Sequence, residues 1–412
     1  MKVSILTLGC KVNQSESAII EGNLINNGVS IVSLSEQPDY CIINTCTVTA
    51  KSDYQSRQLI RRALKARSKV IVTGCYSQLR PNEIKNIAGD INIVYNSNKL
   101  HIISILTNNI KSITYNHISR SRPYIKVQDG CNFTCTYCIV PKARGRSRSL
   151  DIKNVVMQAL ELEQAGFHEI VLTGIHLGSY GYDLKPKATL AYLLKTLLEQ
   201  TKIHRIRLSS IEVKEVDNEL IDLLQERRVC KHIHIPLQSG DDTVLNLMNR
   251  RYTCKDYVSV IEKILKQVPG LAVGTDVIVG FPAEGHAEFL NTKRLLDSIP
   301  IAYMHIFPFS SRPDTIASKM VNQNSFYIKK ERFNDLNSLN IKKKKAYMIS
   351  NINKTLDVIT EKPHIDNTII GTSSNYLKVR VSANGYPKGT LIYVGVSGIE
   401  GDMLVGDVID QT

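Results

Sequence analysis

The stretch Cys131-Asn132-Phe133-Thr134-Cys135-Thr136-Tyr137-Cys138 places three cysteines at C-x3-C-x2-C spacing directly after a strand-like run, Tyr124 to Gln128. Three thiols on one short loop can all bind a single metal centre. An iron–sulfur cube takes four ligands, so three cysteines leave one iron open to a ligand that is not protein. A zinc ion with a distant fourth ligand is the alternative, but zinc sites usually pair two C-x2-C knuckles, and no second knuckle occurs. The pattern therefore favours a catalytic iron–sulfur cluster.

The chain has 412 residues, enough for two or three domains, and its 43% hydrophobic and 22% charged residues are ordinary globular values. The net charge of +14 indicates a polyanionic partner, RNA or DNA, with a basic-leaning cytosolic protein as the plainer alternative. The apolar run before Cys10 is too short for a lipoprotein signal, so we expect no secretion signal. Nine cysteines in such a chain indicate a reducing compartment. No stretch approaches the ~20 apolar residues of a membrane span. We expect a cytoplasmic protein without membrane contact.

Residues 1–115 alternate strand-like and helical segments, which predicts a doubly wound parallel sheet. Cys10, Cys46 and Cys75 follow three of the expected strands at their carboxyl ends, where ligands collect in open α/β sheets. We therefore expect these thiols to converge on a second iron–sulfur cluster, with three small buried apolar residues as the alternative. The remaining cysteines are expected to be structural: Cys41, Cys230 and Cys254.

Residues 116–347 repeat a βα unit six times, which predicts a partial (βα)6 barrel with its chemistry at the carboxyl mouth of the strands. Several residues follow these strands and are candidates for binding a cofactor, although a loop glycine or serine is more often a turn device. They are Gly174, His176, Ser209, Glu212 and Gln238. His232 and His234 alternate on one strand, and we expect packed or hydrogen-bonded histidines there in preference to a metal pair.

A basic run follows the cysteine loop, with cations at Lys142, Arg144, Arg146 and Arg148. Because the cations alternate, an extended conformation would put all four on one side. Such a stripe suits an RNA backbone or a negatively charged substrate. A solvated loop is the alternative.

Residues 348–412, beyond a basic helical connector, hold short alternating β segments with frequent glycine, which predicts a small antiparallel barrel. This segment has seven acidic residues against five basic ones, so the basicity of the chain lies elsewhere.

Over essentially its whole length the chain resembles the methylthiotransferase family of radical S-adenosylmethionine enzymes. The matching motifs are Thr7-Leu8-Gly9-Cys10-Lys11-Val12-Asn13, Asn44-Thr45-Cys46, Thr73-Gly74-Cys75 and the C-x3-C-x2-C loop. The resemblance implies a [4Fe-4S] cluster on Cys131, Cys135 and Cys138. Its open iron would be chelated by S-adenosylmethionine, with Tyr137 near the adenine. The resemblance also implies a second [4Fe-4S] cluster, which carries the sulfur, on Cys10, Cys46 and Cys75, and an RNA-binding TRAM domain at the C-terminal end.

The implied reaction has a physical reason: an unactivated aromatic C–H is too weakly acidic for any side chain to deprotonate, whereas a cofactor radical can remove the hydrogen. The motifs are most similar to the MtaB subfamily, which methylthiolates N6-threonylcarbamoyladenosine next to the tRNA anticodon, at position 37. Sister subfamilies act on isopentenyladenosine in tRNA or on an aspartate of a ribosomal protein. The implied partners are tRNA, a reducing electron donor such as flavodoxin or ferredoxin, and a sulfur donor. Outside the family, the alternative is an iron–sulfur electron carrier or RNA-binding module.

Overall fold

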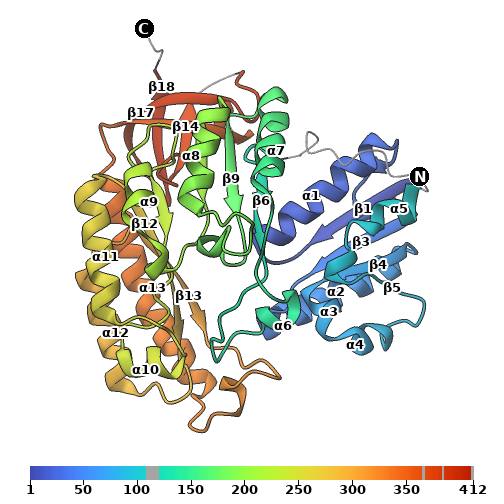
Figure 1. Cartoon of the computed structure of the whole chain (residues 1–412), viewed down its shortest axis with the longest axis horizontal. Coiled ribbons are helices and arrows are strands. Elements are labelled where there is room, and N and C mark those ends of the chain that lie inside the picture. Colours follow the sequence, from blue (N-terminus) through green and yellow to red (C-terminus); the bar gives the residue numbers. More distant parts are fainter. Residues whose placement is uncertain (108–119, 364–366, 383–384, 410–412) are drawn as a thin grey trace.

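The computed structural model describes residues 1–107, 120–363, 367–382 and 385–409. Figure 1 shows an N-terminal α/β part beside a central sheet wrapped by helices, with a small β-barrel at one end of the central part. The expected domain boundary between residues 115 and 116 lies outside the described residues. So do Asp366 and Asp410, two of the seven acidic residues counted in the C-terminal segment.

The N-terminal part is a parallel five-stranded sheet in the order β2-β1-β3-β4-β5, which confirms the predicted doubly wound fold. One apolar cluster on each face of the sheet holds the helices. Helix α1 begins at Lys11, directly after Cys10, and the two-residue strand β2 has no clear sequence signal. The elements are β1 (Lys2–Thr7), α1 (Lys11–Asn26), β2 (Ser30–Ile31), β3 (Tyr40–Thr45), α2 (Ala50–Lys65), β4 (Lys69–Gly74), α3 (Cys75–Leu79), α4 (Pro81–Lys85), β5 (Asn92–Ile93) and α5 (His101–Thr107).

The central part has two parallel three-stranded sheets, β10-β9-β6 and β11-β12-β13, joined by a bridge between Ser210 and His234. They form the predicted partial barrel, and one apolar cluster fills the space between its strands and the helices outside. The strands are β6 (Tyr124–Lys126), β9 (Glu169–Thr173), β10 (Arg205–Leu208), β11 (His232–His234), β12 (Ala272–Val279) and β13 (Tyr303–Pro308). The helices outside are α7 (Ile152–Gln164), α8 (Leu190–Gln200), α9 (Asn218–Leu223), α10 (Asp242–Leu247), α11 (Cys254–Gln267), α12 (His286–Ser298) and α13 (Phe326–Ile349). After the cysteine loop come α6 (Val140–Arg144) and a short ribbon, β7 (Gln128–Asp129) with β8 (Arg148–Ser149).

The C-terminal strands close into a barrel in the order β14-β15-β16-β18-β17. This confirms the predicted small antiparallel barrel, with one parallel pairing, between β16 and β18. The strands are β14 (Thr355–Pro363), β15 (Thr368–Ser373), β16 (Lys378–Ser382), β17 (Leu391–Glu400) and β18 (Met403–Val408).

The small C-terminal barrel covers the amino-terminal ends of the central strands. Arg205 and Arg207 of β10 donate hydrogen bonds to four of its backbone carbonyls, at 2.9 to 3.1 Å. Both guanidinium groups also bind the buried carboxylate of Glu169 on β9. Burial alone would raise the pKa of Glu169, but the two arginines lower it to about 2. The carboxylate is therefore ionised and ties the two parts together.

Candidate active site between two groups of cysteines

The carboxyl ends of β1, β3 and β4 bring Cys10, Cys46 and Cys75 together. Gly9 has φ +100°, and a Cβ on it would lie 2.8 Å from Cβ of Cys46, so the loop before Cys10 rests against Cys46. Gly74 has φ +101°, and a Cβ on it would lie 2.3 Å from a backbone oxygen of β3. Burial is the largest cause of the raised pKa of Cys46, and Cys75 and Cys10 lie close enough to add to the rise.

The environment of these thiols is buried and cationic. Burial raises the pKa of Cys46 and of Cys75, whereas Arg144 and Lys99 act in the opposite direction on Cys75. Cys10 is exposed. The group therefore has an open side at Cys10 and a positively charged wall behind Cys75.

The second group of thiols lies on the loop after β6. Backbone bonds hold the loop: Cys131 N donates to Gly145 O at 3.1 Å, and Cys138 N donates to Cys135 O at 3.1 Å. Nη1 of Arg250 donates to Sγ of Cys135 at 3.4 Å. Burial raises the pKa of Cys138 to about 12. Cationic donors to sulfur stabilise thiolate ligands, so Arg250 belongs to this site although its sequence context gave no signal.

Three of the predicted cofactor residues surround this loop. Tyr137 is partly buried, with its ring edge-on to Phe281 at 6.4 Å between centroids. Gly174 has no room for a side chain, because a Cβ would lie 2.8 Å from the side-chain oxygen of Gln128. His176 lies with Nδ1 3.7 Å from Sγ of Cys131.

His176 is held from its other side by a carboxylate that the sequence did not indicate. Its Nε2 lies 2.6 Å from Oε1 of Glu215. Burial alone would lower the pKa of His176, but the contacts with Cys131 and Glu215 outweigh burial and raise it to about 10. The imidazole is thereby a fixed cation beside the cysteine loop.

The other predicted cofactor residues line the same end of the strands. The hydroxyl of Ser209 is buried and has no hydrogen-bond partner among the described residues. Glu212 forms an ion pair with Arg250. Gln238 has φ +68°, and its backbone pairs with β12 on both sides of Val277. A buried hydroxyl without a partner is costly, and a ligand at this position would satisfy it.

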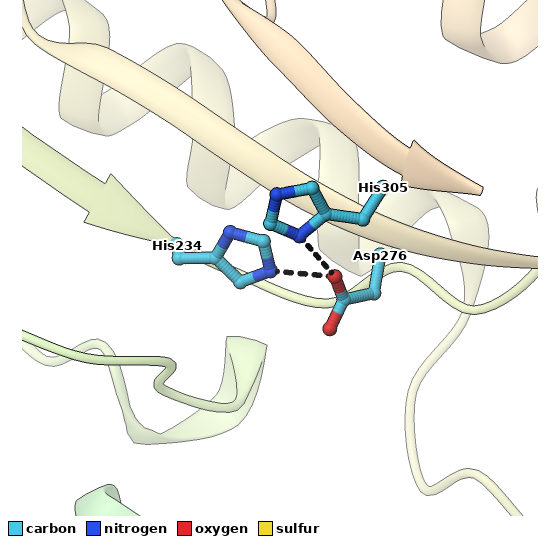
Figure 2. Close-up of side chains that lie close together, drawn as sticks. All are labelled: His234, Asp276 and His305. Carbon is cyan, nitrogen blue, oxygen red and sulfur yellow. Dashed lines mark hydrogen bonds and ion pairs between the residues drawn. The ribbon is translucent and has the colours of Figure 1, made fainter. Parts of the chain in front are cut away.

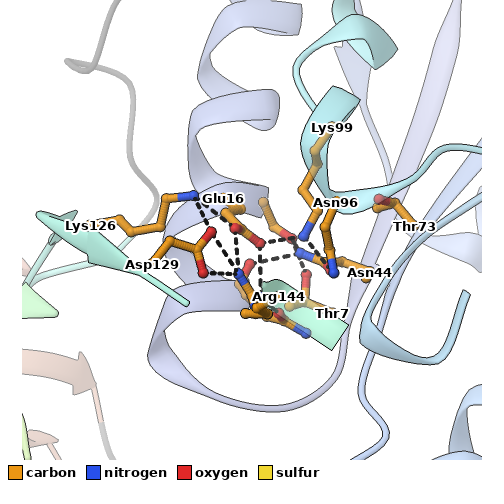
Figure 3. A network of polar contacts seen from close by, with 12 residues as sticks. Thr7, Glu16, Asn44, Thr73, Asn96, Lys99, Lys126, Asp129 and Arg144 are labelled. Atoms are coloured by element: carbon orange, nitrogen blue, oxygen red, sulfur yellow. Dashed lines mark hydrogen bonds and ion pairs between the residues drawn. The ribbon is translucent and has the colours of Figure 1, made fainter. Parts of the chain in front are cut away.

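The predicted extended stripe of cations is wrong. Residues Val140–Arg144 form helix α6, and the guanidinium of Arg144 turns inward, where it is buried. Nη1 of Arg144 binds Oε1 of Glu16 at 2.9 Å and Oδ1 of Asp129 at 3.1 Å (Figure 3). Arg144 therefore cannot contact RNA, whereas Lys142, Arg146 and Arg148 remain exposed.

Figure 3 shows that Glu16 is the centre of a buried polar network between the N-terminal and central parts. Its carboxylate also binds Nζ of Lys126 on β6, at 2.9 Å, and Nζ of Lys99. Burial alone would raise the pKa of Glu16, but the three cations bring it well below the usual range. This network fixes α1, which starts next to Cys10, against the central sheet.

A second contact joins the two parts beyond β13. Backbone N of Ala50 donates to the hydroxyl of Ser310 at 3.1 Å. Nη2 of Arg312 donates to the hydroxyl of Thr47 at 2.9 Å and binds Asp53. The loop that carries Cys46 is therefore docked on the carboxyl end of β13.

Lys11, the neighbour of Cys10, extends toward the inner face of the central barrel. Its ammonium lies 6.0 Å from the ring centroid of Tyr376. Burial and the nearby Arg207 lower the pKa of Lys11 to about 8. Lys11 therefore connects the Cys10 group with this inner face.

Comparisons with known proteins identify the family of the chain. Residues 125–296 match the Radical SAM superfamily and residues 2–96 match the Uncharacterized protein family UPF0004. A threonylcarbamoyladenosine tRNA methylthiotransferase MtaB from Aquifex aeolicus is 38% identical over 96% of this chain and 100% of the relative. The chain belongs to the methylthiotransferase family of radical S-adenosylmethionine enzymes. A tRNA-2-methylthio-N(6)-dimethylallyladenosine synthase from Alkaliphilus oremlandii is 30% identical over 100% of this chain and 93% of the relative.

Among solved structures, the radical S-adenosylmethionine methyltransferase TsrM from Kitasatospora setae has a similar fold, with a TM-score of 0.58. It is 13% identical, and the match covers 77% of this chain and 76% of that one. No helix among the described residues has both the length and the apolar composition needed to cross a bilayer.

Membership of the radical S-adenosylmethionine enzymes implies a [4Fe-4S] cluster and S-adenosylmethionine. The residues of this methylthiotransferase fit them. Cys131, Cys135 and Cys138 supply three sulfur donors from one loop, and Arg250 supports one of them. The unpartnered hydroxyl of Ser209 supplies a donor for a polar ligand.

Proposed function

We propose that this methylthiotransferase places a methylthio group on C2 of N6-threonylcarbamoyladenosine at position 37 of tRNA, next to the anticodon. The observation that carries the proposal is that two separate groups of three cysteines lie in parts of the chain that buried ion pairs at Glu16 and Arg312 hold together. The MtaB relative, which spans nearly the whole chain, supports this choice of substrate.

We assign a [4Fe-4S] cluster to each group, with Cys131, Cys135 and Cys138 holding one and Cys10, Cys46 and Cys75 holding the other. Together with two S-adenosylmethionine molecules, the clusters supply a carbon radical and a methylated sulfur. The protein orients and shields the reactants. His176 and Arg250 fix the first cysteine loop, and Glu16 fixes the second group relative to it. A low-potential electron donor and a sulfur source are required as partners.

RNA would meet the exposed cations that follow the cysteine loop, Lys142, Arg146 and Arg148. Contacts of this kind bind phosphates without regard to sequence and position the strand. The buried Arg144 is no longer among them.

The deciding experiment is mass spectrometry of tRNA nucleosides from a strain that lacks the gene. We expect 2-methylthio-N6-threonylcarbamoyladenosine to disappear, its unmethylthiolated precursor to accumulate, and plasmid expression to restore the product. An unchanged level of the product would refute the substrate. Loss of 2-methylthio-isopentenyladenosine instead would point to the substrate class of the Alkaliphilus relative.

The two-cluster assignment has its own test. Reconstituted protein should bind about eight iron atoms per chain, and Cys10→Ala should bind about half as many. That variant should still cleave S-adenosylmethionine to 5′-deoxyadenosine but no longer methylthiolate RNA. A wild-type protein that binds only about four iron atoms would refute the second cluster.

A further inference from the structure

Three polar side chains meet on neighbouring strands of the inner face: His234 on β11, Asp276 on β12 and His305 on β13 (Figure 2). Nε2 of His234 lies 3.0 Å from Oδ1 of Asp276, and Nδ1 of His305 lies 3.1 Å from the same oxygen. The two imidazoles therefore hold one carboxylate oxygen between them.

A hydrogen-bond chain behind this group fixes it from the buried side. The hydroxyl of Tyr303 lies 2.8 Å from Nε2 of His232 and 3.1 Å from Nδ1 of His234. Burial lowers the pKa of His232 well below its usual value, so this ring is neutral. His232 can then donate to Tyr303, Tyr303 to His234, and His234 to Asp276, which gives each of these donors an acceptor.

Gly274 makes this arrangement possible. It lies between the two inner-face strands that carry the histidines, and a Cβ on it would lie 2.2 Å from the ring of Tyr303. The absent side chain leaves the space that the tyrosine ring occupies. His232 and His234 are therefore hydrogen-bonded core residues, as expected from the sequence.

The second carboxylate oxygen of Asp276, Oδ2, does not take part in these contacts with the histidines. Figure 2 shows it pointing away from both rings, and no described residue donates a hydrogen bond to it. The side chain is only 25% exposed. This oxygen is not among the buried polar atoms that lack a partner, so it is open to solvent and can accept a hydrogen bond from a ligand.

Two aromatic rings stand exposed beside this oxygen. His305 and Phe307 alternate with Met304 and Ile306 along β13, so they face the inner side while their neighbours pack into the core. The side chain of His305 is 52% exposed and Phe307 is 44% exposed, with their ring centroids 6.4 Å apart. Exposed ring faces beside a hydrogen-bond acceptor are the means by which proteins bind unstacked RNA bases.

The position of these residues connects them to the cysteines. Ser310, three residues after Phe307, accepts a hydrogen bond from the loop that carries Cys46. From the other side, the ammonium of Lys11, next to Cys10, lies 6.0 Å from the ring centroid of Tyr376, and this ring lies 5.8 Å from that of Tyr303.

We propose that Asp276, His305 and Phe307 form the binding site for an adenine base that has been extruded from a single-stranded RNA loop. The ring of Phe307 stacks on the base, and the ring of His305, tilted by 70° from that of Phe307, meets the edge of the base. The free oxygen of Asp276 accepts a hydrogen bond from the exocyclic N6–H. This site rests on the proposed function, because it specifies how the RNA substrate is held. Two histidines and a carboxylate can also bind a divalent cation, which is the competing occupant.

The test is binding of the full-length, cluster-loaded protein to fluorescein-labelled anticodon stem–loop RNA, followed by anisotropy. One RNA has adenosine at position 37, and the other has purine riboside, which lacks the exocyclic amine. Asp276→Asn should weaken binding of the adenosine RNA by about 10-fold or more, the loss typical of a hydrogen bond to a charged group, and should leave binding of the purine RNA unchanged. Phe307→Ala should weaken both by about 5- to 150-fold, the range for base–aromatic stacking.

Asp335→Asn is the matched control, because Asp335 forms an exposed ion pair with Lys293 away from this face. Each variant should keep the wild-type circular dichroism and iron content. If Asp276→Asn weakens both RNAs equally, or Phe307→Ala weakens neither, the base site is refuted. A stoichiometric divalent ion that binds the wild type and is lost in Asp276→Asn would also refute it. A third RNA carries N6-threonylcarbamoyladenosine at position 37, and wild-type protein that does not bind this RNA would refute the proposed function itself.

Discussion

Replacing Glu16 by glutamine should loosen the joint between the N-terminal and central parts. The Glu16 side chain is 6% exposed and faces Lys99, Lys126 and Arg144. Glutamine keeps the shape but leaves the three cations with only the carboxylate of Asp129. Breaking a buried ion pair by removing one partner costs about 3 to 5 kcal/mol. Burial already lowers the pKa of Lys99, so this lysine can release its proton in the variant, and we expect a cost near 3 kcal/mol.

A loss of about 3 kcal/mol corresponds to an opening equilibrium roughly 100-fold larger. Hydrogen exchange reports local opening directly, so amides of α1 and α6 should exchange roughly 100-fold faster in Glu16→Gln than in wild type at pH 7. The control is Asp335→Asn, whose ion pair with Lys293 is exposed and should contribute less than about 1 kcal/mol. Exchange in α1 that matches the control would show that the network contributes nothing to the joint.

Three further outcomes are expected. Gly74→Ala should lower the free energy of unfolding by more than about 2 kcal/mol, because φ is +101° and a Cβ would lie 2.3 Å from a backbone oxygen. The control is Gly28→Ala, where φ is +78° but the space is open, and it should lower the free energy of unfolding by only about 1 kcal/mol. Thermal melts measure both. Arg250→Gln removes the donor to Cys135 and should lower the midpoint potential of the cluster on that loop, measured by potentiometric EPR, whereas an unchanged potential would refute the role. The pKa of Glu169 is lowered to about 2, so its ionised carboxylate stabilises the folded state by about 3 kcal/mol. This stabilisation is complete above pH about 4.5 and is lost as the pH falls toward 2. Glu169→Gln should flatten this part of the plot of unfolding free energy against pH, and equal slopes for the variant and the wild type would contradict the prediction.

Periodicity and strand-end positions predicted most of the fold. The α/β order, the six strands of the central barrel and the closed C-terminal barrel followed from local patterns, because each pattern reports which face of an element is buried. The spacing of Cys131, Cys135 and Cys138 predicted a metal-binding loop for a similar reason, since neighbours on a short loop are also neighbours in space.

The failures came from long-range contacts. Arg144 belonged to an alternating run of cations, which predicted an exposed stripe. Its burial depends on Glu16, 128 residues earlier, and nothing near Arg144 in sequence announces that partner. Asp276 and His305 likewise meet only because β12 and β13 pair in one register. Buried ion pairs and inner-face groups depend on strand pairing and domain docking, so local sequence patterns do not contain them.

The joints between the three parts determine how a substrate can reach the two groups of cysteines. The C-terminal barrel blocks the starting end of the strands, where Tyr376 packs on His232 with 4.5 Å between ring centroids. The N-terminal part covers the open side between β6 and β13, held at Glu16 on one edge and at Arg312 on the other. Hydrogen-bonded ion pairs have fixed directions, unlike apolar contacts, so both joints also set the orientation of the parts. Access is therefore left at the carboxyl ends of the strands, where Phe307 is exposed, and a base must be drawn out of its loop to enter there.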